Sequence, residues 1–261
     1  MSIVDTFRLD EKVALIPGGG GAIGSELARA LAQAGASVTI VGRSKEPAEE
    51  AARDVEAVGS EALIVVGDMT TEQDAERCVG ETLDRFGRLD VVINAIGGGA
   101  GSVLHSAHDY PRRDWDWIFE LNVRSALLPT QYAARAMIDA GRGGRILNIS
   151  SVRGQLGIDA GYSAYVAAKG AIDALTRQWA TEWATYGITV NAIAPTFIDT
   201  PQVAMLLGDP EFKAKLISRI PLRRVGQPSD LIGAVLLFCS DAAPYITGQI
   251  LTIDGGLTAT Q

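Results

Sequence analysis

Tyr165 and Lys169 are the two residues of this sequence whose types and spacing most directly suggest chemistry. They stand four residues apart, so a helix would place them one turn apart on the same face. The ordinary pKa of a phenol is about 10, and an ammonium group within about 4–6 Å favours the phenolate and lowers that pKa. Such a pair could take up and release a proton near neutral pH.

Two serines and an asparagine are further candidates for polar chemistry. Ser150 and Ser151 directly follow an apolar, β-branched run, so a strand ending there would deliver both hydroxyls to the carboxyl edge of a sheet. Asn122 lies inside a segment with a helical pattern, where asparagine is a mediocre choice on propensity alone. These three residues therefore join the tyrosine and the lysine as candidate site residues.

A glycine-rich turn, Pro-Gly-Gly-Gly-Gly-Ala-Ile-Gly at residues 17–24, follows the first apolar run of the chain. Its G-x-G-x-x-G match is a weak signal alone, but here it follows a strand pattern and opens a helical one. Without side chains the backbone can approach a pyrophosphate, and the helix N-terminus supplies unpaired N–H groups. The turn therefore predicts a dinucleotide site, with contacts from Gly18, Gly20, Gly21, Ile23 and Gly24.

The end of the second expected strand indicates which dinucleotide is bound. An acidic residue about twenty positions past the glycine turn would hydrogen-bond the ribose 2′-hydroxyl of NAD and repel a 2′-phosphate. The sequence here is Val-Gly-Arg-Ser-Lys at residues 41–45, without an acid. Arg43 offers bidentate donors to a phosphate, and Ser44 or Lys45 could assist it. NADP(H) is therefore favoured over NAD(H), and a solvated basic turn is the alternative.

A regular framework must position these segments, and the hydrophobic pattern predicts one. Most of its apolar runs lack alternation, which is typical of parallel strands covered on both faces; they are residues 13–16, 38–41, 62–66, 91–94, 145–149, 189–194 and 250–253. Helical patterns occupy residues 23–34, 47–58, 71–86, 115–140, 162–186 and 228–240. Thr71 with Asp74 is expected to cap the third helix. The alternation predicts an α/β fold, a doubly wound seven-stranded parallel sheet in one domain over residues 1–261.

Composition agrees with this class and excludes others. The 261 residues are 47% hydrophobic and 21% charged, which provides a sizeable core and excludes disorder, collagen and coiled coil. The net charge of −8 argues against nucleic-acid or anionic-membrane partners. Cys78 and Cys239 are expected to be ordinary buried thiols. No signal-peptide pattern and no apolar run near about 18 residues is present, so a cytoplasmic protein is expected.

Two long segments interrupt the alternation. Residues 97–113 carry His105 and His108, and residues 196–228 are rich in proline. Ligands of open α/β sheets bind beyond the carboxyl ends of the strands, so both segments are expected to form the substrate pocket and its lid. Two histidines beside Asp109 are too few ligands for zinc, and no metal is expected. The absence of a G-x-S-x-G elbow speaks against a Ser–His–Asp hydrolase.

Taken together, these segments resemble the short-chain dehydrogenase/reductase family in its single-domain form, over nearly the whole chain. The resemblance rests on the glycine turn at 18–24, Asp68, residues 94–97, Asn122, Ser151, Tyr165 with Lys169, Pro195 with Thr200, and the closing Thr-Gly-Gln and Asp-Gly-Gly at 247–249 and 254–256. It implies a Rossmann fold and an oxidoreductase that interconverts a secondary alcohol and a ketone with a nicotinamide cofactor.

The resemblance also implies catalytic roles. Tyr165 would be the general acid/base, tuned by Lys169, which would also hold the nicotinamide ribose. Ser151 would hydrogen-bond the carbonyl oxygen, and Asn122 would anchor a water behind the lysine. Ser150 competes for the serine role, but its spacing to the tyrosine fits less well than that of Ser151.

Cofactor contacts follow from the same resemblance. Asp68 would accept from the adenine amino group, Asn94 would pack near the adenosine ribose, and Thr200 would contact the nicotinamide amide or the phosphates. The other expected contacts are Met69, Ala95, Ile96, Gly97, Pro195, Phe197 and Ile198.

Four positions depart from the family pattern. Pro17 stands where threonine is usual and has no N–H to donate. Ala22 replaces a glycine, which adds a methyl group near the phosphates. Ala95 replaces a second asparagine, so a hydrogen bond between two strands is expected to be missing. Thr196 stands where glycine is common.

The expected substrate is a small polar hydroxy compound, that is, a sugar, polyol or sugar acid, by analogy with gluconate-type members of the family. Arg153, two residues past Ser151, could clamp a carboxylate bidentately, and the alternative is a surface arginine paired with an acid. Tyr162, which has no lysine four residues on, and His105 are expected to line the pocket.

Two other functions stay open. One is a 3-oxoacyl-thioester reductase acting on carrier protein or CoA substrates, with a basic patch from residues 112–113 and 223–224. The other is a dinucleotide-binding regulatory protein without turnover. A homodimer or homotetramer is expected in each case, because small apolar residues on two helices suit close packing; they are Ala133, Ala134, Ala167 and Ala171.

Overall fold

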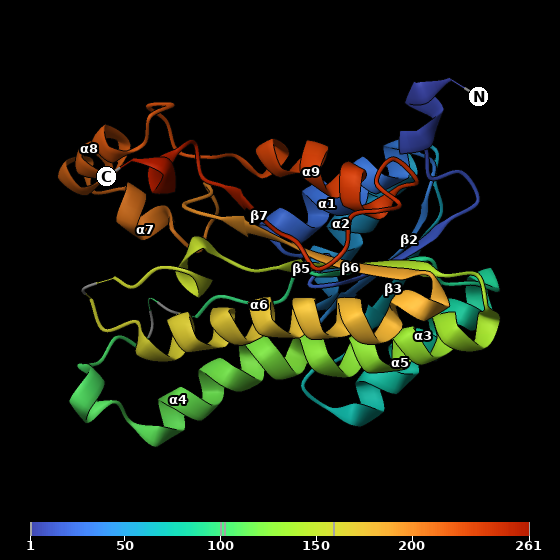
Figure 1. The fold of residues 1–261 in the computed structure, drawn as a ribbon, viewed down its shortest axis with the longest axis horizontal. Helices are drawn as coiled ribbons and strands as arrows, with labels where there is room; N and C mark the ends of the chain where they lie inside the picture. Colours follow the sequence, from blue (N-terminus) through green and yellow to red (C-terminus); the bar gives the residue numbers. More distant parts are fainter. Residues whose placement is uncertain (1, 100, 102, 159, 261) are drawn as a thin grey trace.

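A parallel sheet of seven strands forms the centre of the computed structural model, which describes residues 2–99, 101, 103–158 and 160–260 (Figure 1). The strands are β1 (Val13–Pro17), β2 (Ser37–Gly42), β3 (Ala62–Val66), β4 (Val91–Asn94), β5 (Gly144–Ile149), β6 (Ile188–Pro195) and β7 (Ile250–Ile253). Their order in the sheet is β3-β2-β1-β4-β5-β6-β7, and every pairing is parallel. The predicted doubly wound fold is therefore confirmed.

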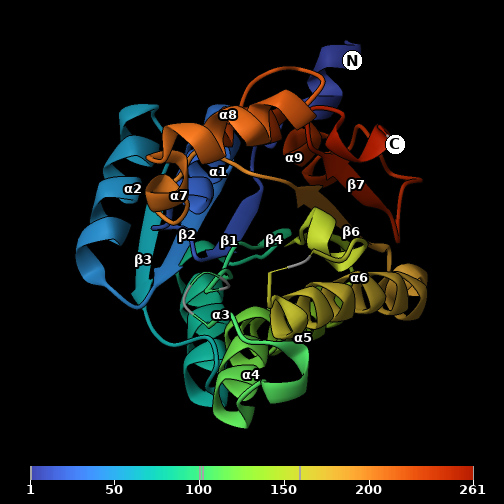
Figure 2. The same ribbon diagram turned by 90° about the vertical axis from the view of Figure 1, so that its left-hand side faces the viewer.

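Helices cover both faces of this sheet, as Figure 1 shows. One face carries α1 (Ala22–Gln33), α2 (Lys45–Ala57) and α9 (Ile232–Cys239), and the other carries α3 (Glu72–Phe86), α5 (Ser125–Ala140) and α6 (Ser163–Trp183). A further helix, α4 (Arg112–Phe119), precedes α5. The segment after β6 forms α7 (Ala204–Leu207) and α8 (Pro210–Arg219), which lie beyond the end of these layers at the left of Figure 1 and face the viewer in Figure 2. Among the described residues, no helix is both long and apolar enough to cross a membrane.

Each helical layer packs against its own hydrophobic cluster. Leu27 and Phe238 are buried in the cluster beneath α1, α2 and α9, and Met137 and Trp179 in the cluster beneath α3, α5 and α6. Strands β1, β4 and β6 are buried at every position, as expected for parallel strands covered on both faces. The sheet is therefore a rigid base from which the loops at its carboxyl edge extend.

Both cysteines are buried in these clusters, as the sequence predicted. Cys78 belongs to one cluster and Cys239 to the other. Burial raises the pKa of each thiol to about 12, so neither is a reactive thiolate.

The long helix predicted at residues 115–140 is interrupted. The α-helix α4 ends at Phe119, a π-helical turn η4 (Glu120–Arg124) follows, and α5 begins at Ser125. The turn carries Asn122, whose Nδ2 donates to the carbonyl of Ile118 at 3.0 Å. A π-turn inserts one residue without changing the apolar composition, so the helical pattern did not reveal it.

The expected alanine face of α5 faces the core instead of a partner. Ala133 and Ala134 are fully buried in the cluster that also contains Met137. The expectation that they support oligomer packing is therefore wrong, because residues at helical spacing fit the chain's own core equally well. Ala167 and Ala171 on α6 are only half-buried.

Candidate active site

Two adjoining cavities open at the carboxyl ends of the strands. One has a volume of about 520 Å³, and its walls include Ser151, Tyr165 and Lys169. The other has a volume of about 550 Å³, and its walls include Arg43 and Asp68. They share Gly20, Gly21 and residues 95–97 as walls. The sheet therefore brings the predicted catalytic residues and the predicted cofactor residues to one cleft.

The glycine turn between β1 and α1 forms the floor of both cavities. Gly21 is the N-cap of α1 and offers no side-chain cap, so the first N–H groups of the helix are free to face a ligand. A Cβ at Gly20 would lie 3.0 Å from the backbone nitrogen of Ala48, so this glycine-lined floor, the glycine cradle, has little room for a side chain. Ala22, the departure from the family pattern, lies on the wall of the catalytic cavity and leaves the turn intact.

Strands β1 and β4 remain linked despite Ala95. Its backbone N–H donates to the carbonyl of Pro17 at 2.8 Å, so the backbone supplies a link between these strands where one was expected to be missing. Pro17 itself pairs with Val41 of β2 as the last residue of β1. Its missing N–H therefore does not prevent the turn from forming.

Two of the expected cofactor residues lie away from the cleft. The amide of Asn94 donates to Thr130 at 2.7 Å and to Asn148 at 2.8 Å, inside the protein. Phe197 packs against Phe212, with ring centroids 6.0 Å apart. Every other expected cofactor residue lines one of the two cavities.

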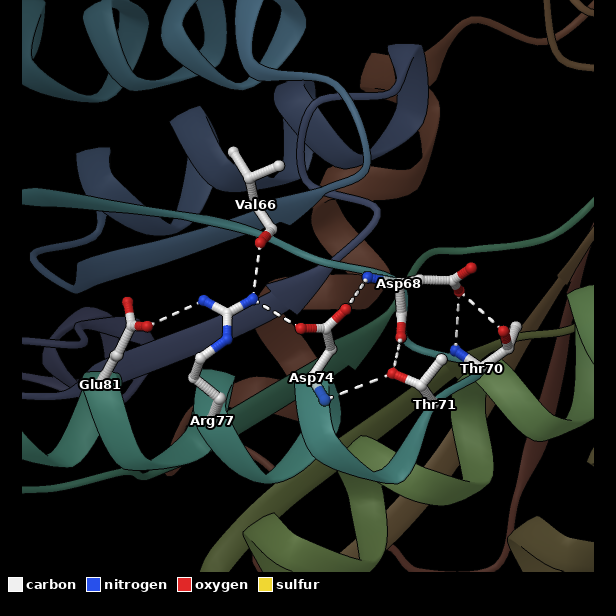
Figure 3. A network of polar contacts seen from close by, with 7 residues as sticks. All are labelled: Val66, Asp68, Thr70, Thr71, Asp74, Arg77 and Glu81. Carbon is white, nitrogen blue, oxygen red and sulfur yellow. Dashed lines mark hydrogen bonds and ion pairs between the residues drawn. The ribbon is translucent and has the colours of Figure 1, made fainter.

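A polar network at the start of α3 positions Asp68 (Figure 3). Its Oδ1 accepts from the backbone and hydroxyl of Thr70 at 2.9 and 2.8 Å, and its own N–H donates to Asp74 at 2.8 Å. Thr71 accepts from the N–H of Asp74 at 3.3 Å, which confirms the predicted helix cap. Arg77 donates to Asp74 at 2.7 Å and lowers the pKa of that carboxyl.

The basic turn after β2 leaves one arginine available to a ligand. Arg43 is exposed on the cavity wall, and within the described part of the chain it forms no ion pair. Lys45 instead pairs with Glu49 on α2 at 2.9 Å. Ser44 is the N-cap of α2, but its hydroxyl makes no capping hydrogen bond. Arg43 and Ser44 are therefore the two groups of this turn that can contact a phosphate.

The candidate catalytic residues converge on the wall of the 520 Å³ cavity. Lys169 is 3% exposed, its Nζ donates to the carbonyl of Ile149 at 2.9 Å, and it lies 5.7 Å from the ring centroid of Tyr165. Ser151 is 8% exposed and accepts from the N–H of Arg153 at 3.2 Å. The helix α6 and the end of β5 thus supply the two halves of the site.

The pKa of Tyr165 differs from the expectation. Burial raises it, and the hydrogen bond with Ser151 and the charge of Arg153 oppose that rise. The Lys169 ammonium donates to the Ile149 carbonyl, and a lowering of the pKa of Tyr165 by this lysine stays a prediction. Burial also lowers the pKa of Lys169 to about 8, against the charge of Asp173.

The two neighbouring serines face different environments. The hydroxyl of Ser150 donates to the buried carboxylate of Asp173 at 2.5 Å. The hydroxyl of Ser151 lies close enough to Tyr165 to lower the pKa of the tyrosine against burial, and it donates to the carbonyl of Pro195 at 3.5 Å. Ser151 is therefore the serine placed to act with the tyrosine.

Asn122 holds the loop after β4 against the lysine. Its Oδ1 accepts from the N–H of Gly98 at 2.9 Å, and its Nδ2 donates to the Gly98 carbonyl at 3.0 Å. A Cβ at Gly97 would lie 2.9 Å from Lys169 Nζ and 3.0 Å from Asn122 Oδ1, so both groups flank this glycine. The carboxamide therefore fixes the loop, and its expected role in anchoring a water stays a prediction.

The residues expected to contact substrate are divided between two places. His105 and Tyr162 line a separate cavity of about 690 Å³, whose described walls do not include Ser151 or Tyr165. His105 contacts Asp114 at 2.8 Å. Arg153 adjoins Ser151, and its Nη1 donates to the carbonyl of Gly157 at 3.1 Å. Tyr162 also reaches the catalytic tyrosine, because its ring centroid lies 6.5 Å from that of Tyr165.

Two residues of the segment after β6 lie at the cleft, as expected for this segment, although neither was singled out as a site residue. Gln202 donates to the carbonyl of Gly97 at 3.3 Å and thereby joins this segment to the loop after β4. Thr196 has a buried hydroxyl without a hydrogen-bond partner among the described residues, at the wall of the catalytic cavity. Neither residue type carries a sequence signal for binding. The unpartnered hydroxyl and the glycine cradle both fit a bound dinucleotide.

Comparison with known proteins agrees with this site. A family model described as enoyl-(acyl carrier protein) reductase matches residues 20–258. The gluconate 5-dehydrogenase of Gluconobacter oxydans is 37% identical over 261 residues, covering 100% of both chains. A crystal structure of a gluconate 5-dehydrogenase from Burkholderia cenocepacia in complex with NADP and tartrate is 35% identical, with a TM-score of 0.91 and 100% of both chains covered. A 7α-hydroxysteroid dehydrogenase complexed with NADH and 7-oxo glycochenodeoxycholic acid is 34% identical, with a TM-score of 0.91 and 98% of both chains covered.

Fold, cleft and relatives together define a dinucleotide-binding oxidoreductase of secondary alcohols. The chain belongs to the short-chain dehydrogenase/reductase family. It is an NAD(P)-dependent dehydrogenase acting on CH–OH groups.

Proposed function

We propose that this dehydrogenase acts on a small hydroxy acid of the sugar-acid type, with NADP(H) as the preferred cofactor. The observation that carries the substrate class is the position of Arg153 beside Ser151, without an ion-pair partner in the described chain. The gluconate 5-dehydrogenase relatives and the tartrate in one of their crystal structures support the same class.

The surroundings of Arg153 favour an anionic ligand. Burial lowers the pKa of its guanidinium, and the charge of Arg219 on α8 lowers it further. A half-buried cation near a second cation is destabilised unless an anion joins them. A substrate carboxylate would relieve this repulsion and could accept two parallel hydrogen bonds from the guanidinium. The alternative of a surface arginine paired with an acid is not what the described residues show.

The catalytic groups then act on the hydroxyl-bearing carbon. Tyr165 would take the proton of the alcohol during oxidation and return it during reduction. The hydroxyl of Ser151 would donate to the substrate oxygen, where negative charge develops. Lys169 would hold positive charge beside this oxygen from its place on the Ile149 carbonyl. A bound nicotinamide supplies the hydride acceptor or donor.

The cofactor preference rests on Arg43. Its exposed guanidinium lines the same cavity as Asp68 and Met69, at the end of the cleft away from Tyr165. A 2′-phosphate would find a charged donor there, whereas no acid stands at this strand end to bind a 2′-hydroxyl.

The carrier-protein alternative loses part of its basic patch. Arg224 is held by Asp230 through two hydrogen bonds of 2.6 and 2.7 Å. Arg112 and Arg113 remain exposed at the start of α4. A weakened patch on an acidic chain favours a small substrate over a protein-bound one.

The experiment is a spectrophotometric assay of reduced cofactor with purified protein. We would test gluconate-type sugar acids, neutral polyols of equal length and 3-oxoacyl esters, each with both cofactors. We expect turnover of the acids, loss of about 10³-fold in kcat for Tyr165→Phe, and a rise of at least about tenfold in KM for Arg153→Ala. An unchanged KM for the sugar acids in Arg153→Ala, or turnover of neutral polyols as efficient as that of the acids, would contradict the substrate proposal.

A further inference from the structure

We propose that Asp173 is a positioning residue of this active site, which acts through Ser150 on the end of β5 and keeps Lys169 in its charged form. The proposal rests on the proposed function only in that Lys169 takes part in the reaction. Asp173 is not itself among the described wall residues of the cleft, so its effect is indirect.

The geometry joins Asp173 to the catalytic residues on two sides. Along α6 it lies one turn beyond Lys169 and two turns beyond Tyr165. Across the helix, its Oδ1 accepts from the hydroxyl of Ser150 at 2.5 Å. Ser150 stands between Ile149, whose carbonyl accepts from the Lys169 ammonium, and Ser151. The carboxylate therefore anchors the strand end that supplies both contacts.

The chain is built closely around this carboxylate. The short turn η5 (Val152–Gly154) lies over it, and a Cβ at Gly154 would lie 2.7 Å from Asp173 Oδ2 and 2.9 Å from the Lys169 carbonyl. Asp173 is 3% exposed. A buried acid is costly unless hydrogen bonds or charges compensate it, so an acid enclosed this tightly points to a requirement for its charge.

The charged groups that face this region are few. The charged groups near Asp173 are Lys169 and Arg177, both on α6. The uncharged hydroxyl of Ser150, directly after β5, donates a hydrogen bond to it. Among the described residues, Asp173 is the charge that supports the protonated form of Lys169 against burial, which lowers the pKa of the lysine to about 8. Burial in turn raises the pKa of Asp173, and the hydrogen bond from Ser150 opposes that rise. Arg153 on η5 acts on Tyr165 and not on this pair.

The test separates charge from shape. Asp173→Asn keeps the acceptor for Ser150 and removes the charge, whereas Ser150→Ala keeps the charge and removes the hydrogen bond. Asp139→Asn on α5, an exposed acid, is the matched control. The readout is the pH titration of the Lys169 side chain by NMR with labelled lysine, which needs no substrate and is assigned with Lys169→Met.

We expect Asp173→Asn to lower the pKa of Lys169 by about one unit, and Asp139→Asn to leave it unchanged. Provided that the wild type turns over, the alkaline limb of kcat/KM of the Asp173→Asn variant should move with the lysine pKa. This corresponds to a loss in the variant of about tenfold above pH 9 and about twofold at pH 7. An unchanged lysine titration in folded Asp173→Asn protein would overturn the proposal.

Ser150→Ala provides a second route if Asp173→Asn does not fold. We expect a fall of about tenfold in kcat with an unchanged dissociation constant for the cofactor. Wild-type kcat in this variant would overturn the anchoring role. Absence of turnover with sugar acids, beside a shifted lysine titration, would contradict the proposed substrate and leave the positioning role supported.

Discussion

Gly24 in the first turn of α1 lies so close to Gly18 that the Cβ of any other residue at position 24 would overlap the Gly18 carbonyl. Gly18 is itself confined. Its φ of +86° belongs to the left-handed region, and the backbone of Ala95 is so near that a Cβ added at Gly18 would lie 2.7 Å from the Ala95 carbonyl carbon. We expect Gly24→Ala to lower the free energy of unfolding by about 1–3 kcal/mol and to abolish cofactor binding. Urea denaturation and fluorescence titration with NADPH would measure the two effects.

Gly80 is the matched control for this substitution. It lies in the middle of α3, and a Cβ there would meet no atom within 4 Å. Gly80→Ala should therefore stabilise the protein by about 0.5–1 kcal/mol through helix propensity and leave cofactor binding unchanged. Similar behaviour of the two variants would show that the contact between Gly24 and Gly18 is unimportant.

Lys169→Met should stabilise the protein at neutral pH relative to alkaline pH. The folded pKa of about 8 lies below the ordinary value of 10.5, so the folded state resists protonation of this lysine. The resulting destabilisation is fully present below pH 8 and disappears as the pH rises through about 10.5. The variant removes this destabilisation but leaves the buried Asp173 without the lysine charge, which offsets part of the gain. We therefore expect the change in the free energy of unfolding to be more favourable at pH 7 than at pH 9.5 by about 2 kcal/mol, by urea denaturation at both values. An equal change at both pH values would contradict this explanation.

Thr71→Ala should loosen the start of α3. Loss of the cap is expected to lower the free energy of unfolding by about 1 kcal/mol and to weaken cofactor binding, because the cap shares Asp74 with the turn that holds Asp68. Thr181→Ala, an exposed threonine on α6, is the control and should change neither quantity. A loss of stability with wild-type cofactor affinity would separate the cap from the Asp68 turn.

Arg43→Ala should reduce affinity for NADPH by about tenfold to a hundredfold, which is the range expected for lost hydrogen bonds to a charged group. Affinity for NADH should stay unchanged, because the 2′-hydroxyl does not need this guanidinium. Arg53→Ala on α2, another exposed arginine, is the control. Parallel losses for both cofactors, measured by fluorescence titration, would contradict a 2′-phosphate contact.

The strands and the cleft were predictable because their signals are local. All seven expected strands lie within one residue of the observed bounds at both ends, since an apolar β-branched run specifies a buried strand by itself. The glycine turn and the pair of Tyr165 and Lys169 can likewise be recognised from the spacing of their residues. The fold and the convergence of these residues therefore followed from the sequence.

The directions of side chains were less predictable because they depend on distant partners. Asn94 turns inward because Thr130 and Asn148 complete its hydrogen bonds, and these residues are remote in the sequence. The ammonium of Lys169 donates to the carbonyl of Ile149 at the end of β5, and the spacing of Tyr165 and Lys169 along one helix cannot predict a contact with a strand. The pKa of Tyr165 follows burial, which is a property of the whole fold.

The π-turn at residues 120–124 also sets the rotational phase of the two helices that it joins. One residue corresponds to about 100° of helical rotation. Removing a single residue here would let α4 and α5 merge into a regular helix. With Ala133 and Met137 of α5 still buried in the core, α4 would then be rotated about its axis, and Ile118 and Asn122 would no longer face their present partners. Chains of this fold can therefore gain or lose residues in the loop before α4 much more easily than within this turn.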